Sequence, residues 1–308
     1  MLLFRKPSYR HFGPCCAGLL LLLAQPARCV LFYSTGDPAF NTNAPTRSLT
    51  NSGWQYQGAW VGFSGTVISS NCFLTAKHFG GAIGAAFTFQ GTDYLTTASY
   101  DDPASDLRIL RVAGQFPISA QLYAKRNERG KNFVVIGRGT PRGNEVRLNN
   151  KLKGWLWGPG DGIQRWGVNR VRAILDGGPA LGELLYANFV AGGGRNHADL
   201  SAGDSGGAVF IKDGKLCKLA GINYAVDGPY NTTNSGAGFD AALFDRRGLY
   251  QETAPGTWTL VPQRGAKQPG GFYATRVSSR LDWINGILAG ADRDSGAVVA
   301  ISTNSLPF

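Results

Sequence analysis

Hydrophobic and polar residues alternate along much of this chain with a period of two, the period of a β-strand that buries one face. Short segments of this kind occupy residues 59–63, 66–68, 72–76, 86–89, 107–112, 133–136, 184–190, 208–211 and 219–224. Gly, Asn and Asp are common between them, as expected for tight turns. Many short strands joined by such turns are typical of antiparallel barrels and sandwiches. The pattern therefore predicts an all-β protein.

One segment near the end of the chain has the periodicity of a helix instead. Leu281, Ile284 and Leu288 recur on one helical face, and Ser278 or Ser279 can cap the first turn. A single apolar face of this kind predicts a helix that packs on the rest of the protein.

The chain divides into segments by composition. Residues 125–131 are polar and highly charged and lie between two apolar runs, so we place a boundary there. It separates an N-terminal half, residues 30–125, from a C-terminal half, residues 126–290. Residues 291–308 are small and polar and predict a loose C-terminal tail.

Residues 1–29 have the parts of a secretory signal peptide. The start is basic, residues 17–24 form a short apolar run, and Ala27-Arg28-Cys29 offers small residues for cleavage. An apolar run this short does not cross the ~30 Å hydrocarbon core of a bilayer, so we expect no stable membrane anchor. An uncleaved anchor is the alternative. The protein is predicted to be secreted or periplasmic.

The composition is that of a folded protein, with 43% hydrophobic and 17% charged residues. Removal of the leader lowers the formal net charge from +11 to +7 and leaves two cysteines, Cys72 and Cys217. These two could form one disulfide, a point that the sequence leaves open. No cluster of His or Cys has metal-ligand spacing, so we expect neither a metal nor an organic cofactor.

Cations recur in the middle of the chain. They are Arg142, Arg147, Lys151, Lys153, Arg165, Arg170 and Arg172. Such a run can bind an anionic surface, but more often it forms a solvated face. We expect no nucleic-acid partner.

The first motif with chemistry is Gly203-Asp204-Ser205-Gly206-Gly207, which precedes an apolar segment. A Ser between glycines in a tight turn can present its Oγ while backbone N–H groups point at one spot, as a nucleophile with an oxyanion hole requires. The α/β-hydrolases share the G-x-S-x-G pattern, but they place their His after the Ser. No His follows Ser205, so that alternative is excluded.

His78 is the leading candidate for the base that Ser205 requires. The chain has three histidines, of which His11 lies in the predicted leader and His197 lies eight residues before Ser205. His78 directly follows an apolar strand, which is a rigid position for a general base.

Asp106 is the candidate for the acid that orients His78. It opens an alternating strand, from which a carboxylate can hold an imidazole in one tautomer and stabilise its protonated form. Asp101 and Asp102 compete for this role, but they lie in a loop with Pro103. Only Asp106 continues directly into the apolar strand.

Together these motifs resemble the three signatures of the trypsin/chymotrypsin-like serine proteases, in that family's order His, Asp, Ser. The matching segments are Leu74-Thr75-Ala76-Lys77-His78, Asp106-Leu107 with the strand it opens, and Gly203-Asp204-Ser205-Gly206-Gly207. Residues 133–139 are similar to the first strand of the family's second barrel, and residues 273–284 to its closing strand and C-terminal helix. The resemblance covers roughly residues 55–290.

The resemblance implies two six-stranded antiparallel β-barrels with a C-terminal helix, one barrel in each half of the chain, and a site in the cleft between them. Ser205 would attack the scissile carbonyl, His78 would transfer the proton and Asp106 would orient His78. The backbone N–H groups of Gly203 and Ser205 would form the oxyanion hole. The partners would be protein or peptide substrates, hydrolysed by a monomeric exported endopeptidase.

The same resemblance implies substrate-binding residues. Ile222-Asn223-Tyr224 is similar to the strand that pairs with the substrate backbone, which makes Asn223 and Tyr224 candidates. Asp199 lies where trypsin-like members carry an acid at the base of the specificity pocket, which implies cleavage after Arg or Lys. Alternatively, Asp199 is an ordinary turn residue, and small or apolar residues precede the scissile bond.

The chain departs from the family at the activation site. No Arg followed by Ile-Val-Gly-Gly occurs, so what neutralises Asp204 stays open. The alternative function is a catalytically weak or inactive relative that binds peptides or surfaces. Loss of a triad residue would be its sign, and all three residues are present.

Overall fold

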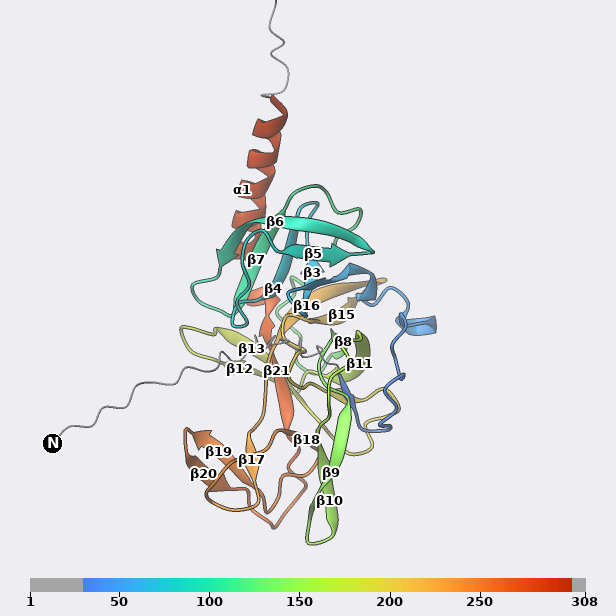
Figure 1. Ribbon diagram of the computed structural model, residues 1–308, viewed down its shortest axis with the longest axis vertical. Helices are drawn as coiled ribbons and strands as arrows, with labels where there is room; N and C mark the ends of the chain where they lie inside the picture. The colour runs from blue at the N-terminus through green and yellow to red at the C-terminus, as the bar shows by residue number, and fades with distance from the viewer. Residues whose placement is uncertain (1–29, 301–308) are drawn as a thin grey trace, which may run out of the picture.

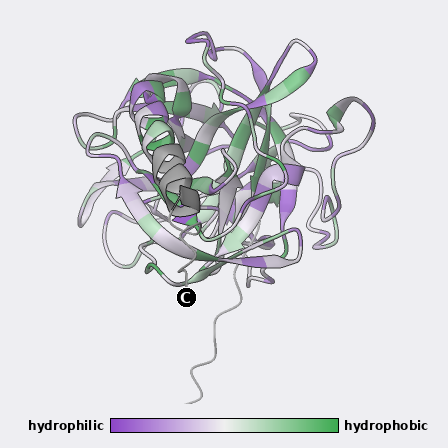
Figure 2. Cartoon of the chain, turned by 90° about the horizontal axis from the view of Figure 1, so that it is seen from above, coloured by the Kyte–Doolittle hydropathy of each residue, from purple (hydrophilic) through white to green (hydrophobic). Residues whose placement is uncertain are grey.

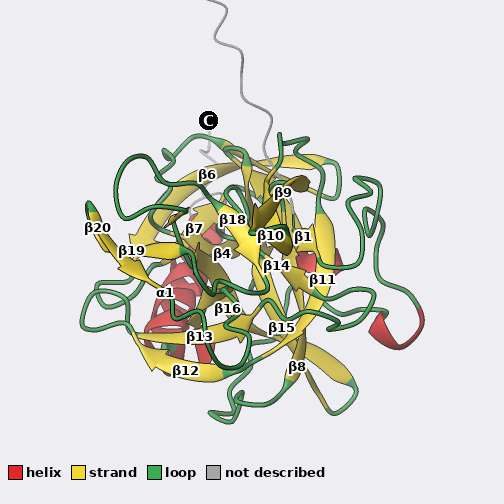
Figure 3. Ribbon diagram, turned by 90° about the horizontal axis from the view of Figure 1, so that it is seen from below, coloured by secondary structure: helices red, strands yellow, loops and turns green. Residues whose placement is uncertain are grey.

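The computed structural model describes the backbone of residues 30–300 and the side chains of residues 30–290 (Figure 1). The predicted signal peptide, residues 1–29, lies outside the described residues, as do residues 301–308. Strands dominate the described chain (Figure 3).

The first half of the chain forms a closed antiparallel barrel of six strands. They are β2 (Gln57–Trp60), β3 (Phe63–Val67), β4 (Cys72–Ala76), β5 (Ala86–Phe89), β6 (Thr92–Asp101) and β7 (Leu107–Val112), paired in the order β2-β3-β4-β7-β6-β5. Its interior is narrow, and two glycines leave room for stacked rings. Phe73 and Phe87 stack with their centroids 3.9 Å apart. A Cβ on Gly58 would lie 2.3 Å from the Phe87 ring, and one on Gly65 would lie 2.6 Å from that of Phe73.

The second half forms an antiparallel sheet whose order is β11-β8-β15-β16-β21-β13-β12. The strands are β8 (Asn132–Gly137), β11 (Arg165–Arg170), β12 (Ala173–Asp176), β13 (Glu183–Asn188), β15 (Ala208–Asp213), β16 (Leu216–Val226) and β21 (Gly271–Arg276). Only Val171 and Arg172 separate β11 from β12, which lie at opposite ends of this order. The two therefore act as one bent strand that brings the ends of the sheet together as a second barrel. The predicted all-β, trypsin-like fold class is confirmed.

Smaller elements surround the second barrel. They are β1 (Leu31–Phe32), paired with β14 (Ala198–Asp199); β9 (Arg142–Leu148) and β10 (Lys151–Trp157), paired with β18 (Ala241–Leu243); β17 (Tyr230–Asn231), β19 (Tyr250–Ala254) and β20 (Thr257–Leu260); and the 3-10 helices η1 (Arg47–Leu49), η2 (Trp54–Tyr56) and η3 (Val277–Ser279). The hairpin β9–β10 and the segment from β17 to β20 lie at the end of the molecule opposite the first barrel (Figure 1).

Helix α1 (Leu281–Ala300) follows the second barrel but packs on the first one. Ile284 is fully buried in a cluster that contains Leu107 and Ile109 of β7. The helix then projects beyond the first barrel (Figure 1) and is seen nearly end-on in Figure 2, where many hydrophilic segments lie in the outer loops. It continues to Ala300, so the first ten residues of the expected tail, 291–308, are helical. Within the described residues, no helix is both long and apolar enough to span a membrane.

Two ion pairs join segments that are far apart in the sequence. Glu128, from the predicted boundary, is fully buried and accepts a hydrogen bond of 3.0 Å from Nε of Arg276 at the end of β21. Asp102, also fully buried, accepts hydrogen bonds of 2.5 and 2.6 Å from Arg280. The first pair ties the segment between the barrels to the second barrel, and the second pair ties the loop between β6 and β7 of the first barrel to the segment before α1. The division at residues 125–131 stays a prediction.

Candidate active site

His78 is positioned by the rigid end of strand β4, whose five residues are all buried. The backbone N–H of Lys77 donates to the Asp106 carbonyl oxygen over 2.8 Å. Its ammonium donates to the carbonyl oxygens of Asp102 at 2.9 Å and Ser105 at 2.8 Å. These bonds join the segment after β4 to the loop before β7, so His78 and Asp106 are held beside each other.

The structure brings His78, Asp106 and Ser205 together in one hydrogen-bonded line. Nδ1 of His78 lies 2.7 Å from Oδ2 of Asp106, and Nε2 lies 2.8 Å from Oγ of Ser205. The second carboxylate oxygen of Asp106 accepts the backbone N–H of His78 at 3.0 Å. The Asp106 side chain is 4% exposed, whereas that of His78 is 37% exposed. A carboxylate that accepts Nδ1–H leaves Nε2 free to take the Ser205 proton.

The two competing acids have other partners. Asp101 forms an ion pair with Arg108 over 2.6 Å, which holds its pKa below the usual value. Burial raises the pKa of Asp102, but hydrogen bonds from Arg280, Ala104 and Ser105 outweigh that effect, so its pKa also lies below the usual value. The sequence argument selected the acid that lies against His78.

The loop that carries Ser205 requires glycine at position 206. Gly206 has φ of +74°, and a Cβ there would lie 2.4 Å from the Ser64 carbonyl oxygen and 2.3 Å from Oγ1 of Thr75. Within the described residues, the backbone N–H groups of Gly203 and Ser205 donate to no protein acceptor. The two donors are therefore available to a ligand beside Ser205 Oγ, as an oxyanion hole requires.

Asp204 accepts hydrogen bonds from the backbone N–H groups of Gly139 at 2.7 Å and Ser201 at 2.9 Å. Burial raises the pKa of Asp204 to about 8, against the opposing effect of the hydrogen bonds from Ser201. Burial therefore favours the neutral form of this carboxyl group. A neutral carboxyl group needs no counter-cation. The neutral form is therefore one answer to what neutralises Asp204 in a chain without the family's activation sequence.

A cavity of about 100 Å³ lies beside Ser205. It is lined by Trp157, Leu200, Ser201, Ala202, Asp204, Ser205, Asn223, Tyr224, Ala225 and Val226. Tyr224 also meets the His78 ring edge-on, with the centroids 5.7 Å apart. Asn223 supports the loop that carries Ser205, because its side-chain amide donates to the Asp204 carbonyl oxygen at 3.1 Å and to the Ile136 carbonyl oxygen at 3.0 Å.

The structure does not bring Asp199 to this cavity. Asp199 lies in β14, where it pairs with Leu31, and it is 2% exposed. Burial raises its pKa well above the usual value, and its Oδ1 has no hydrogen-bond partner within the described residues. Burial therefore favours the neutral form of Asp199, which is not among the residues that line the cavity.

Sequence reasoning missed the three large apolar residues of the wall, Trp157, Leu200 and Val226. Leu200 follows Asp199 directly, and Val226 lies two residues after Tyr224, so their closeness in sequence to these two candidates could have identified them. Trp157 arrives from the hairpin β9–β10, and no local pattern identifies it. Within the described residues, no group of three or more His, Cys, Asp or Glu side chains could hold a metal ion. Cys72 and Cys217 are not bonded to each other.

Among the comparisons with known proteins, a family model agrees with the sequence resemblance. A solved structure titled neuropsin, a serine protease expressed in the limbic system of mouse brain, is similar over 79% of this chain and 98% of its own, with 15% identity and a TM-score of 0.46. The sequence matches none of the curated proteins. The family model for trypsin matches residues 44–242. Because this match spans more than half of the chain, the protein belongs to the trypsin family.

Proposed function

We propose that this protein is a serine endopeptidase that works through an acyl-enzyme intermediate. The observation that carries the proposal is the position of the His78 ring, whose nitrogens lie 2.7 Å from Asp106 and 2.8 Å from Ser205. In the first step the Ser205 Oγ bonds to the scissile carbonyl carbon while its proton passes to Nε2 of His78. His78 then gives this proton to the leaving amine as the C–N bond breaks. A water molecule, activated by His78, then attacks the acyl-enzyme ester in the same way and releases the carboxylic acid product.

The negative charge that develops on the carbonyl oxygen is stabilised by the backbone N–H groups of Gly203 and Ser205. Each such donor contributes about 3 kcal/mol to the lowering of the barrier when it is aimed at the oxyanion. Gly206 supports this arrangement, because only a glycine fits its backbone conformation and surroundings.

The substrate backbone is proposed to pair with the end of β16. Strand β15 pairs with β16 only as far as Ile222, and the backbone of Asn223 is bonded to Gly206 and Gly207. Beyond Asn223, no strand of the described residues pairs with this edge of β16, and Tyr224, Ala225 and Val226 line the cavity next to Ser205. An extended peptide can add there as a further strand, which binds it largely independently of its sequence.

The residue before the scissile bond is proposed to be small or apolar. The cavity beside Ser205 has about 100 Å³, and Trp157, Leu200 and Val226 give it apolar walls. A Lys or Arg side chain would bury its charge there beside a single acid of the lining, Asp204, whose two oxygens already accept hydrogen bonds from Gly139 and Ser201, while Asp199 lies outside the lining. An unpaired buried charge is strongly unfavourable.

The test of the proposed function is labelling with a fluorophosphonate, which reacts with an activated serine. The native protein should be labelled and the variant Ser205→Ala should not. Absence of labelling in correctly processed native protein would support the alternative, an inactive relative that binds peptides. Cleavage of a peptide library then shows which residue precedes the scissile bond. Export and removal of residues 1–29 are tested separately by sequencing the N-terminus of the secreted chain.

A further inference from the structure

A basic pocket lies on the outside of the second barrel. It has a volume of about 850 Å³ and shares no residue with the cavity beside Ser205. Its wall contains five cations and no Asp or Glu. The cations are Arg129, Arg170, Arg172, Arg246 and Lys267.

Most of these cations lack an acidic partner. Arg170 uses its Nε to donate to the Gly130 carbonyl oxygen at 2.7 Å. Arg129, Arg172 and Lys267 are exposed, and within the described residues they pair with no carboxylate. Like charges gathered in one concave surface repel each other, so the pocket is poised to bind an anion.

Arg246 differs from the other four because it is half-buried. It lies 3.7 Å from the Asp227 carboxylate, which also accepts hydrogen bonds of 2.7 Å from the hydroxyl groups of Tyr186 and Tyr273. Its Nε is buried and has no hydrogen-bond partner within the described residues. The shared carboxylate offsets the charge of Arg246 only in part.

The other cations of the basic run in the sequence are used differently. Arg147, Lys153 and Arg165 form ion pairs with acids, and Arg142 covers the Trp155 ring at 4.1 Å. Arg170 and Arg172 are the members of that run that line the basic pocket. Lys151 is exposed outside the pocket, so Arg170 and Arg172 are the only two cations of the run that folding gathers in a wall without acids.

We propose that the basic pocket binds a sulfated polysaccharide. Several cations on one concave surface can hold several sulfates of one chain at the same time. Gln268 in the wall adds an amide group suited to sugar hydroxyls, and Asn188, whose amide nitrogen donates to the Tyr186 hydroxyl at 3.2 Å, adds its amide oxygen.

A single-stranded nucleic acid fits the basic pocket less well, because it binds by stacking its bases on aromatic rings. The aromatic residue in the wall is Tyr186, whose hydroxyl is held by Asp227.

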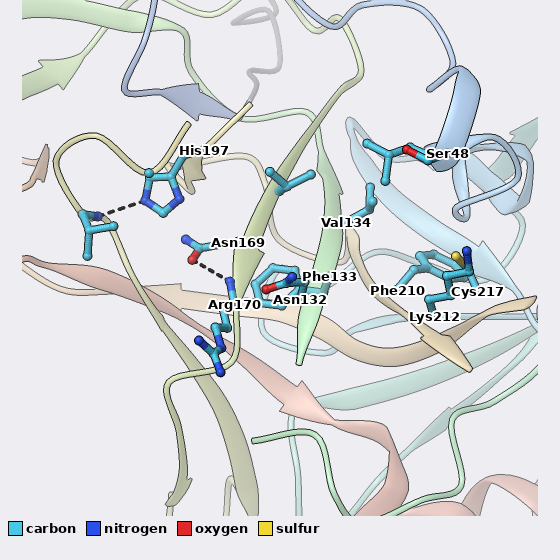
Figure 4. A pocket seen from close by; sticks show the side chains of 14 residues that line it. Ser48, Asn132, Phe133, Val134, Asn169, Arg170, His197, Phe210, Lys212 and Cys217 are labelled. Atoms are coloured by element: carbon cyan, nitrogen blue, oxygen red, sulfur yellow. Dashed lines mark hydrogen bonds between the residues drawn. The ribbon is translucent and has the colours of Figure 1, made fainter. Parts of the chain in front are cut away.

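The neighbouring cavity extends this surface. It has about 510 Å³ and shares Asn169, Arg170 and Val190 with the basic pocket (Figure 4). Figure 4 shows Arg170 and Lys212 on opposite sides of it. A chain that leaves the basic pocket past Arg170 therefore meets a further cation at Lys212, so a polymer fits the surface better than a single anion.

The test measures heparin binding by the Ser205→Ala protein, so that the result depends neither on proteolysis nor on the proposed function. The double variant Arg129→Gln/Arg172→Gln is compared with Lys151→Gln/Lys215→Gln, which removes two exposed cations outside the basic pocket. The pocket variant should bind heparin about 25-fold more weakly, roughly fivefold for each cation. Its plot of log K against log salt should be shallower by roughly two. The control variant should change binding by less than about threefold.

Two results would overturn the proposal. Equal weakening by the two double variants would mean that heparin follows only the net charge of the protein. Equally tight binding of single-stranded DNA of the same charge would mean that the site does not select a sulfated polysaccharide. Thermal unfolding of both variants shows whether each is folded, and Arg129→Lys/Arg172→Lys, which keeps both charges, should restore most of the binding.

Discussion

Exchange of Asp106 for asparagine should lower catalysis, whereas exchange of Asp102 should lower stability, although the two acids are only four residues apart. The carboxylate of Asp106 accepts the backbone N–H of His78 at 3.0 Å through one oxygen and faces Nδ1 at 2.7 Å through the other. In Asp106→Asn the amide oxygen keeps the backbone bond, so the NH₂ group faces Nδ1. Nδ1 must then accept, and the ring proton moves to Nε2, which can no longer take the proton of Ser205.

The expected loss in kcat for Asp106→Asn is about 10⁴, or about 5.4 kcal/mol in the activation barrier. The unfolding free energy should change by less than about 1 kcal/mol, because the side chain keeps its shape and one hydrogen bond. Asp102→Asn instead removes the charge that Arg280 holds through two hydrogen bonds of 2.5 and 2.6 Å. Breaking a buried pair costs about 3–5 kcal/mol. Arg280 is 23% exposed, so we expect about 2–3 kcal/mol.

The assay combines kcat on a fluorogenic peptide with denaturant unfolding of the same samples. The folded pKa of Asp102 lies below its usual value, so its stabilising effect is present above the unfolded pKa of about 4 and is lost as the pH falls through the lower folded value. The difference in stability between the native protein and Asp102→Asn should therefore shrink below about pH 4. A 10⁴-fold loss of kcat in folded Asp102→Asn, with Asp106→Asn active, would refute the assignment.

Three further results are expected. The pKa of Asp204 is raised to about 8 in the folded state, so its contribution to the unfolding free energy should decrease as the pH rises from about 4 to 8. Urea unfolding at several pH values should show a smaller decrease for Asp204→Asn than for the native protein, and an equal decrease would contradict a raised pKa of Asp204. Trp157→Ala should shift peptide-library cleavage toward larger side chains before the scissile bond, whereas Asp199→Asn should leave the preference unchanged, and the reverse outcome would make Asp199 the specificity residue. Gly206→Ala should abolish fluorophosphonate labelling, because the new Cβ would lie 2.4 Å from the Ser64 carbonyl oxygen, and a fully labelled variant would show that the loop tolerates a side chain there.

The order of the three motifs and the alternation of the strands were readable from the sequence because they are local properties. The alternation of a strand can be recognised within about five consecutive residues. The glycines that the nucleophile loop requires are direct sequence neighbours of Ser205. The family and the fold class could be predicted on this basis, and both are confirmed. The helix was predicted from Leu281 onward, but its extension to Ala300 was not, because small residues such as Ala permit a helix as readily as a loose tail.

The wall of the cavity and the use of each charge depend on residues that are distant in sequence. Trp157, from the hairpin β9–β10, lines the same cavity as Ser205 only in the folded chain, and the pKa of Asp199 is raised only because the folded protein buries it. The sequence by itself determined which residues could carry the chemistry, since backbone period and turn geometry are set by neighbours. The tertiary structure alone decided which cations are paired, which acids are buried and how large the cavity is. Desolvation and ion pairing depend on what packs around a group, and in this protein those neighbours come from opposite ends of the chain.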